Sequence, residues 1–436
     1  MATLIESPKG GTAGLSSRAA TVMHSITSDM ADLPPAAANT TARPLRILQV
    51  ISSVSSLDGG SSTAMWSILE ALRHRDVDTD LITTNEDGAH RTSDVPLGRF
   101  IHRPGYRIRY FPSAGNRYAT SWPMARWLFA HVRDYDVVHT HGVFRFSPVT
   151  AAYAALLRGV PYVVTLHNAF GTWGLSNRRP LLKKLSIGML EGRMIRRARR
   201  VHLCSPDELE QVSRVVPLGQ RAAVFPLGLD LRGAQIAAVD APQERMATKA
   251  RTILFMSRIH EIKGLDALLH AFATIHKTLP DDVEVAVAGM GDEHLVRSLQ
   301  ALTVRLKIDH RVRWLGFVQG AAKEALLRSA SVFVLPSRSE NFGYAVVEAM
   351  LAGLPVITTE NVPTGEFVKM ADGGIVYDGS TRGLEHSLMR MLSYSPQQLQ
   401  DVGQRGSRTV RTKLSLDTFG ESLESCYRAA AVPAAR

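Results

Sequence analysis

The chain has 436 residues, a formal net charge of +11 at pH 7 and 45% hydrophobic residues. This length exceeds one ordinary core, so we expect two domains in a soluble globular protein, with no run apolar enough to span a membrane. The two cysteines show no metal-ligand spacing, and they form no disulfide framework. Both features favour a reducing cytoplasm. The excess positive charge predicts an anionic partner.

The sequence divides into five segments. Residues 1–43 are rich in Ala, Ser, Thr, Gly and Pro without a sustained period, which predicts a disordered N-terminal extension. Apolar strands alternate with helical patterns over residues 44–230 and again over residues 251–412. This alternation predicts an α/β protein with two doubly wound, Rossmann-like domains facing across a cleft. Residues 231–250 are expected to form a linker, and residues 413–436 a helix that packs back on the first domain.

Three local patterns give further expectations. Residues 178–200 are interpreted as one long basic helix, and two helices are expected after the strand GGIVYDG. Aspartates in DVDTD and RDYD imitate a metal motif, but each group precedes a strand, at the edge opposite the cleft. We therefore interpret Asp76, Asp78, Asp80, Asp134 and Asp136 as solvated turn residues and expect no metal site.

The stretch SRSENFGYAVVEAMLAG places one glutamate before a helix and another within it. A loop leaves the strand SVFVLPS, and the helix begins after Gly343, so free backbone amides there can bind a phosphate or a sugar hydroxyl. Glu340 can then face the cleft, while Glu348, about one turn into the helix, can accept a hydrogen bond from a diol. The alternative is that both glutamates are ordinary surface residues around a tight turn.

The first loop of the second domain, SRIHEIKGLD, carries two cations at the carboxyl edge of the sheet. Arg258 and Lys263 suit a diphosphate, because a guanidinium clamps two oxygens and an ammonium adds a point charge. Either could instead be a solvated loop residue. Glycines in AGMGDE and the strand end LGFVQ, which includes Val318, give weaker signals for a nearby nucleobase.

These motifs occur together, and in order, in a known family. SRIHEIKGLDALLHAFA, VAVAGMGDE, VRWLGFV and SVFVLPSRSENFGYAVVEAMLAGLPVITT, preceded by a Gly59-Gly60 turn, DVVHTHG and TLHN, resemble retaining glycosyltransferases of family 4 over roughly residues 44–430. The resemblance implies the GT-B fold and transfer of a sugar from a nucleotide diphosphate sugar with retention of anomeric configuration. The cations and the helix end can replace a divalent metal, so no cofactor is expected.

The resemblance also implies roles for individual residues. Arg258 and Lys263 match the diphosphate-binding pair, Glu340 the acid that contacts the donor sugar, and His167 a histidine near the reacting centre. These four are the predicted catalytic residues. The full set of predicted donor contacts is Gly59, Gly60, Arg258, Lys263, Val318, Glu340, Asn341, Phe342, Gly343, Tyr344, Ala345 and Glu348. His139 and His141 are left open between the site and a structural hydrogen bond.

The expected partners follow from the same reasoning. By resemblance they are a nucleotide sugar donor and a saccharide or lipid-linked acceptor of bacterial exopolysaccharide, lipopolysaccharide or related glycan synthesis. Residues 178–200 hold nine Lys or Arg and Glu191 alone among acids, interleaved with apolar residues, so they either dock on the inner face of an anionic membrane or form a solvated basic face. No nucleic-acid motif is present. Two rival functions remain, a GT-B sugar-nucleotide epimerase and a non-catalytic sugar-nucleotide-binding protein.

Overall fold

The computed structural model describes residues 43–55, 60–88, 91–116, 118–171, 180–229 and 251–432. Within it, Leu45–Arg436 form one compact unit. The predicted linker, Gly59 and, apart from Arg43, the predicted N-terminal extension lie outside the described residues.

An eight-stranded sheet forms the N-terminal half, in the order β3-β4-β2-β1-β5-β6-β7-β8. β3 runs antiparallel to β4, and the other described pairs are parallel. The strands are β1 (Leu45–Val50), β2 (Val77–Thr84), β3 (Phe100–Arg103), β4 (Tyr106–Phe111), β5 (Val137–His141), β6 (Tyr162–Thr165), β7 (Arg200–Leu203) and β8 (Ala222–Val224). The helices are α2 (Gly60–Leu72), α3 (Trp122–His131), α4 (Phe146–Arg158), α6 (Pro180–Ser186), α7 (Gly192–Arg197) and α8 (Pro206–Ser213), with short turns η2 (Val132–Asp134) and η4 (Gly219–Arg221).

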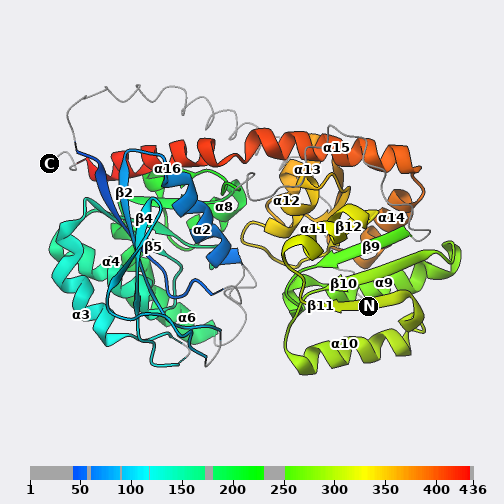
Figure 1. The fold of residues 1–436 in the computed structure, drawn as a ribbon, viewed down its shortest axis with the longest axis horizontal. Coiled ribbons are helices and arrows are strands. Elements are labelled where there is room, and N and C mark those ends of the chain that lie inside the picture. The colour runs from blue at the N-terminus through cyan, green and yellow to red at the C-terminus, as the bar shows by residue number, and fades with distance from the viewer. Residues whose placement is uncertain are drawn as a thin grey trace, which may run out of the picture. The chain divides into compact units, whose positions relative to one another are not determined.

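Alternate residues of β1 face opposite sides of this sheet, as the period of two requires. Ile47 packs with Ile68 of α2, whereas Leu48 packs with Leu128 of α3 and Ala151 of α4. α3 and α4 therefore cover one face, and α2 covers the other (Figure 1). Because both faces are buried, β6 reads as a nearly continuous apolar run in the sequence, whereas β2, β4 and β5 also carry polar residues.

A six-stranded, all-parallel sheet forms the C-terminal half, in the order β11-β10-β9-β12-β13-β14. The strands are β9 (Arg251–Met256), β10 (Val283–Ala288), β11 (Val312–Gly316), β12 (Val332–Leu335), β13 (Val356–Thr359) and β14 (Gly374–Tyr377). The helices are α9 (Leu265–Ile275), α10 (Glu293–Arg305), α11 (Gly320–Ser329), α12 (Tyr344–Leu351), α13 (Gly365–Ala371), α14 (Thr381–Leu392), α15 (Pro396–Lys413) and α16 (Leu416–Ala431), with turns η5 (Glu261–Lys263), η6 (His276–Thr278) and η7 (Asp309–Arg311).

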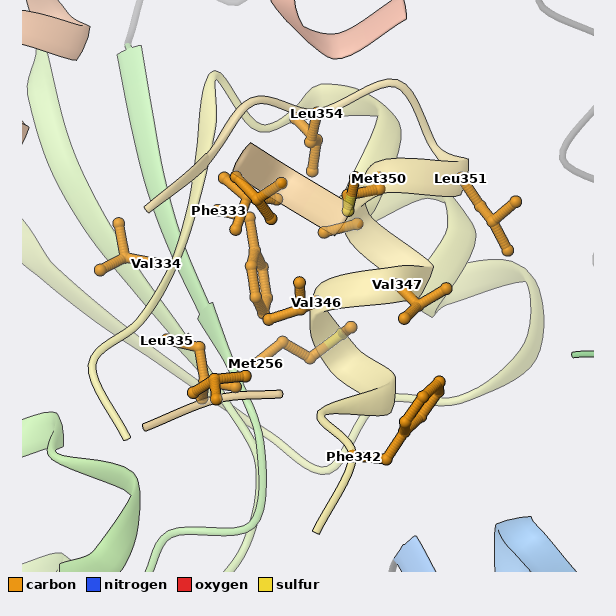
Figure 2. Packing of buried hydrophobic residues seen from close by; sticks show 14 of the residues in the cluster. Met256, Phe333, Val334, Leu335, Phe342, Val346, Val347, Met350, Leu351 and Leu354 are labelled. Carbon is orange, nitrogen blue, oxygen red and sulfur yellow. The ribbon is translucent and has the colours of Figure 1, made fainter. Parts of the chain in front are cut away.

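Helix α12 is held by its apolar side. Figure 2 shows Val346 and Met350 of this helix beside Phe333 of β12, and all three side chains are fully buried. Burying side chains of this size contributes about 1.5–3 kcal/mol each. The start of α12 is therefore fixed at the carboxyl edge of the sheet.

Three helices, not two, follow β14, and the expectation of two is wrong. α14 and α15 belong to the second half, and α16 packs on α2 of the first half. Arg75, just after α2, bonds Glu424 of α16 at 3.4 Å and the backbone oxygen of Asp417 at 2.8 Å. The short helices α8 and α13 were also missed, because seven or eight residues carry too little periodicity to detect.

The predicted basic helix is interrupted. Its described part consists of α6, a π-helical turn η3 (Ile187–Glu191) and α7, and β7 already begins at Arg200. The π turn forms because the amide of Gly192 bonds the Ile187 oxygen, which would lie 2.4 Å from any Cβ at position 192. Arg178 and Arg179 lie outside the described residues.

The interpretation of Asp80 as a solvated turn residue is wrong. β2 begins at Val77, so Asp78 and Asp80 are both strand residues and not turn residues; Asp78 is exposed, whereas Asp80 is buried. Asp80 pairs with Arg107, its neighbour in register on β4, at 2.6 Å and accepts a hydrogen bond from the Tyr135 hydroxyl at 2.6 Å. A buried carboxylate is tolerated there because both partners satisfy it.

Candidate functional site

A cavity of about 1230 Å³ is lined by residues of both halves. From the second half these residues follow the carboxyl ends of β9, β10, β11 and β12, where ligands bind in open parallel sheets. A single small-molecule site is typically about 300–1,000 Å³. The cavity is therefore somewhat larger than a typical site for one small molecule.

Two loops of the second half are packed together at the cavity wall. Gly264 has a φ of +70°, and a Cβ there would lie 2.1 Å from the backbone oxygen of Pro336. The Ile262 oxygen accepts hydrogen bonds from the amide of Arg338 at 2.7 Å and from the Ser337 hydroxyl at 2.9 Å. This close approach, which requires glycine, brings the loop after β9 against the loop after β12.

The contact between these loops pairs two predicted site residues. Lys263 forms an ion pair with Glu340, and both side chains are mostly buried. Arg258 also lines the cavity, is exposed, and forms no ion pair within the described ranges. An anion in the cavity would thus meet a free guanidinium and an ammonium shared with a carboxylate.

The helix start lies beside them. Gly343, with a φ of +95°, is the N-cap of α12 and makes no side-chain hydrogen bond to the first amides of the helix. A Cβ at Gly343 would meet the Thr364 hydroxyl at 2.6 Å. Tyr344 and Ala345 line the cavity, as do Asn341 and Phe342. The helix N-terminus therefore borders the cavity beside both cations.

The second glutamate has a partner that sequence reasoning missed. Glu348 accepts a hydrogen bond from Lys323 of α11 at 2.6 Å, and both side chains are about 30% exposed (31% for Lys323, 27% for Glu348). Both residues line the cavity, as do Val318 and its exposed neighbour Phe317. Lys323 lies 25 positions from Glu348, so no local pattern links them.

The N-terminal half supplies a wall that was largely unpredicted. Gly60 lines the cavity as expected, together with Asn116 and Phe144. Arg145 and Glu86, which also line it, form an ion pair at 2.6 Å. The arginine directly follows a strand-end turn, which is the one signal that could have drawn attention to it.

His167 joins the site through Asn341 and is not itself a lining residue. Its Nδ1 lies 3.1 Å from the Asn341 amide nitrogen, so Nδ1 accepts and Nε2 carries the proton. Burial, with a smaller contribution from His202, lowers the pKa of His167 to about 3, so the ring is neutral. His167 has a φ of +52° and the next residue, Asn168, a φ of +54°, both unusual for residues other than glycine.

His139 and His141 belong to a buried hydrogen-bond chain. The Gln49 amide donates to the Tyr427 hydroxyl at 2.9 Å, and its oxygen accepts from His141 Nε2 at 2.8 Å. The Tyr427 hydroxyl lies 2.8 Å from His139 Nδ1. Burial lowers the pKa of both histidines well below the usual value, so both are neutral.

The chain continues across the sheet with one consistent set of proton positions. His202 Nε2 donates to the Phe225 oxygen at 3.0 Å, so its Nδ1 accepts from the Thr165 hydroxyl at 3.0 Å. Thr165 then accepts from His139 Nε2 at 2.8 Å, which leaves His139 Nδ1 to accept from Tyr427. These contacts favour the structural interpretation of His139 and His141.

In the part of the chain that the structure describes, no cluster of three or more His, Cys, Asp or Glu is arranged to hold a metal. Asp134 pairs with His131 at 3.1 Å, and Asp136 accepts a hydrogen bond from the amide of Arg46 at 2.8 Å. None of the described helices is both long and apolar enough to cross a membrane.

Two family profiles match the chain, in agreement with its two halves. Residues 239–408 match the family described as "Glycosyl transferases group 1", and residues 59–228 match the "Glycosyl transferase 4-like domain". A phosphatidyl-myo-inositol mannosyltransferase from Mycobacterium leprae is 26% identical over 344 residues, which cover 77% of this chain and 84% of the relative.

Solved structures of the same architecture are similar over most of the chain. A sucrose-phosphate synthase from Thermosynechococcus elongatus has a TM-score of 0.69 at 19% identity, and covers 88% of this chain and 98% of its own. HepE from Anabaena, solved in complex with UDP-glucose, has a TM-score of 0.67 at 18% identity, and covers 88% and 100%. These likenesses confirm the predicted fold class, with two parallel-sheet α/β halves arranged as in GT-B structures.

Proposed function

The chain belongs to the family 4 glycosyltransferases and has their GT-B fold, and from this premise we propose that it transfers a sugar from a nucleoside diphosphate sugar with retention of anomeric configuration. The acceptor is a saccharide or a lipid-linked saccharide. The observation that carries the proposal is the meeting of Arg258, Lys263, Glu340 and the start of α12 at one cavity.

This arrangement fits the charge that develops during transfer. As the bond between the anomeric carbon and the phosphate oxygen breaks, the departing diphosphate gains negative charge, which Arg258, Lys263 and the helix amides stabilise. The acceptor oxygen bonds to the anomeric carbon, and its proton goes to the departing phosphate oxygen. Glu340 lies against the Lys263 ammonium and orients the donor sugar.

In this step the acceptor attacks the anomeric carbon from the same face that the diphosphate leaves. Such a direct transfer agrees with the state of the carboxylates at the cavity. Glu86, Glu340 and Glu348 each pair with a cation, and Asp292 caps α10 by accepting from the amides of His294 and Leu295. A covalent intermediate needs a nucleophilic carboxylate beneath the anomeric carbon. Among the described lining residues, every carboxylate accepts from a cation or from backbone amides, which lowers its nucleophilicity and supports a direct transfer.

The same electrostatic groups support independence from a divalent metal. Two cations and a helix end supply the stabilisation usually left to a bound ion. Turnover in excess chelator is expected to equal turnover without it. Complete loss in chelator, restored by manganese or magnesium, would contradict this part of the proposal.

We also propose peripheral contact with an anionic membrane through the described part of the basic segment. Met194 and Ile195 are buried in the core, but Leu185, Met189 and Leu190 are exposed. The exposed cations around them are Lys184, Arg193, Arg196 and Arg197. Apolar side chains that are not used in packing, among cations, favour docking on the inner face of a bacterial membrane over a merely solvated face.

A donor and acceptor screen tests the transferase proposal. The full chain is incubated with a panel of nucleoside diphosphate sugars, with and without a membrane lipid extract, and nucleotide release is measured. Release that depends on the acceptor is expected. Interconversion of the donor without an acceptor would identify an epimerase, and binding without turnover across the panel would identify a sugar-nucleotide-binding protein.

A further inference from the structure

Glu208 lies in the first turn of α8, away from the cavity and outside every motif used above. The sequence Ser-Pro-Asp-Glu, with Ser205 as N-cap, predicts a capping box, in which the glutamate side chain returns to the N-cap amide. The structure contains half of it. The Ser205 hydroxyl accepts from the amide of Glu208 at 3.2 Å, but the carboxylate bonds elsewhere.

Both carboxylate oxygens accept from other segments. Oε1 accepts from the amide of Asn168 at 2.6 Å, and Oε2 accepts from the amide of Cys204 at 2.7 Å. Glu208 is only 2% exposed, and burial raises its pKa to about 7. A buried carboxylate costs several kcal/mol that two neutral donors only partly offset. Its presence indicates a role beyond holding α8 in place.

Asn168 connects Glu208 to the loop after β12, which carries Glu340. Its side-chain amide donates to the Ser339 hydroxyl at 3.3 Å and to the backbone oxygen of Glu340. The neighbouring His167 meets Asn341 at 3.1 Å. Two adjacent residues in the left-handed region are strained and need outside support. The bond from Glu208 to the amide of Asn168 supplies that support at the turn.

We propose that Glu208 is a positioning residue for the transfer reaction: it holds the turn of His167 and Asn168 against the loop Ser339–Asn341 and so orients Glu340. The inference rests on the proposed transferase function. A purely structural carboxylate would end on a local segment, whereas this path ends on the backbone of the residue that contacts the donor sugar.

The test compares kinetic constants and binding for Glu208→Gln and the wild type. Glutamine keeps the size but turns one acceptor into a donor facing a backbone N–H. We expect kcat to fall about 100-fold, because a small misplacement of a reacting group costs that much. The KM for the donor and the calorimetric Kd for free nucleoside diphosphate are expected to change about twofold or less, because Arg258 and Lys263 are untouched.

Glu210→Gln is the matched control. Glu210 lies on the same helix, is exposed, and pairs with Arg214 at 2.6 Å without touching the turn. This variant should keep the wild-type kcat. Loss of kcat in both variants would show a general effect of charge on α8 and would overturn the proposal.

Asn168→Ala provides an independent route if Glu208→Gln does not fold. It removes the bonds to Ser339 and Glu340 and keeps the backbone amide that Glu208 binds. We expect a similar loss of kcat. The kcat of the double variant should be no lower than that of the less active single variant, because both changes break one path. A wild-type kcat in folded Glu208→Gln overturns the proposal. If Glu208→Gln does not fold, a wild-type kcat in Asn168→Ala overturns it. Losses of kcat that multiply in the double variant overturn it as well. If the wild type transfers no sugar from any donor, the proposed function fails, and the positioning role fails with it.

Discussion

The two sheets use the polar side chains at their carboxyl ends differently. At the second sheet, charged side chains line the cavity and pair along its wall, Lys263 with Glu340 and Lys323 with Glu348. At the first sheet, neutral histidines such as His139 are fully buried in one chain of hydrogen bonds. Charges that line a cavity can exchange partners when an anion binds, whereas a buried neutral chain of hydrogen bonds fixes one geometry. We call the paired charges at the second sheet the responsive wall, and we call the histidine chain at the first sheet, whose residues are not among those that line the cavity, the rigid wall.

The largest expected effect is a pH dependence of the free energy of unfolding, which arises from the buried histidines of the first half. Burial holds the pKa of His139 and His141 far below the usual value, that of His167 at about 3 and that of His202 at about 4. Below about pH 6.5 the unfolded chain binds protons that the folded chain refuses, so stability falls as pH falls. Each histidine contributes about 1.4 kcal/mol per pH unit. Glu208 opposes them, because its raised pKa makes the fold more stable as pH falls from about 7 towards 4.5.

Asp207 and Glu366, whose pKa burial also raises, oppose the histidines too, so the expected net loss in the free energy of unfolding is at most about 4 kcal/mol per pH unit between about pH 6 and pH 5. Urea unfolding across this range measures it. His202→Gln removes one group and should reduce the slope by about 1.4 kcal/mol per unit. If the free energy of unfolding does not change over this range, the histidines of the hydrogen-bond chain are not buried in the neutral form.

The next effect tests the responsive wall. Arg258→Ala and Lys263→Ala should each lower kcat about 100- to 1,000-fold with the fold retained, because both cations face charge that grows in the transition state. Lys263→Ala should also reduce stability, since it leaves Glu340 without its cation. Steady-state kinetics and thermal unfolding measure both. Arg297→Ala, an exposed arginine paired with Glu293, is the control, and near-normal turnover in both test variants would remove the assignment.

The two glutamates should separate catalysis from binding. Glu340→Gln is expected to lower kcat about 100-fold, while Glu348→Ala should weaken nucleoside diphosphate binding about tenfold, since its carboxylate can accept a hydrogen bond from the diol of the nucleotide's ribose. Calorimetry with free nucleoside diphosphate measures the second effect apart from turnover. If Glu340→Gln loses nucleotide affinity while Glu348→Ala keeps it, the two roles are reversed.

The responsive wall was the more predictable of the two. Arg258, Lys263 and Glu340 follow apolar strands in the connecting segments, and Glu348 lies in the helix that follows one of these segments, so strand periodicity places all four at one edge. Their pairing was not predictable, because Lys263 and Glu340 lie 77 positions apart and meet only through the close approach at Gly264. Long-range contacts of this kind leave no local periodicity.

The rigid wall was largely hidden in the sequence. His139 and His141 could be read as site residues or as structural ones until the structure showed Tyr427, 288 positions from His139, bonded to His139 and linked to His141 through Gln49. Glu208 imitated an ordinary capping box, and Asp80 a solvated turn, because both patterns depend on the partner and not on the residue itself. Buried polar groups are defined by what satisfies them, which tertiary structure alone decides.

The last expected effect concerns binding at the outer surface of the first half, away from the cavity. Arg196 and Arg197 are exposed on the same helical segment as the exposed side chains of Leu185, Met189 and Leu190, whereas Arg199 and Arg200 are partly buried. Replacing Arg196 and Arg197 with glutamine should weaken binding to anionic vesicles by about 1 kcal/mol per cation, or about 30-fold in all. Binding of the wild type should also weaken as salt rises.

Vesicle co-sedimentation decides between membrane docking and a solvated face. The matched control replaces Arg382 and Arg390, two exposed arginines of α14 in the other half, with glutamine. If both double variants sediment like the wild type, the basic segment is a solvated face. If both lose binding equally, net charge alone drives it. Loss confined to Arg196→Gln/Arg197→Gln, with turnover of a short soluble acceptor unchanged because the cavity is untouched, would show that the first half carries the docking surface while the second carries the responsive wall.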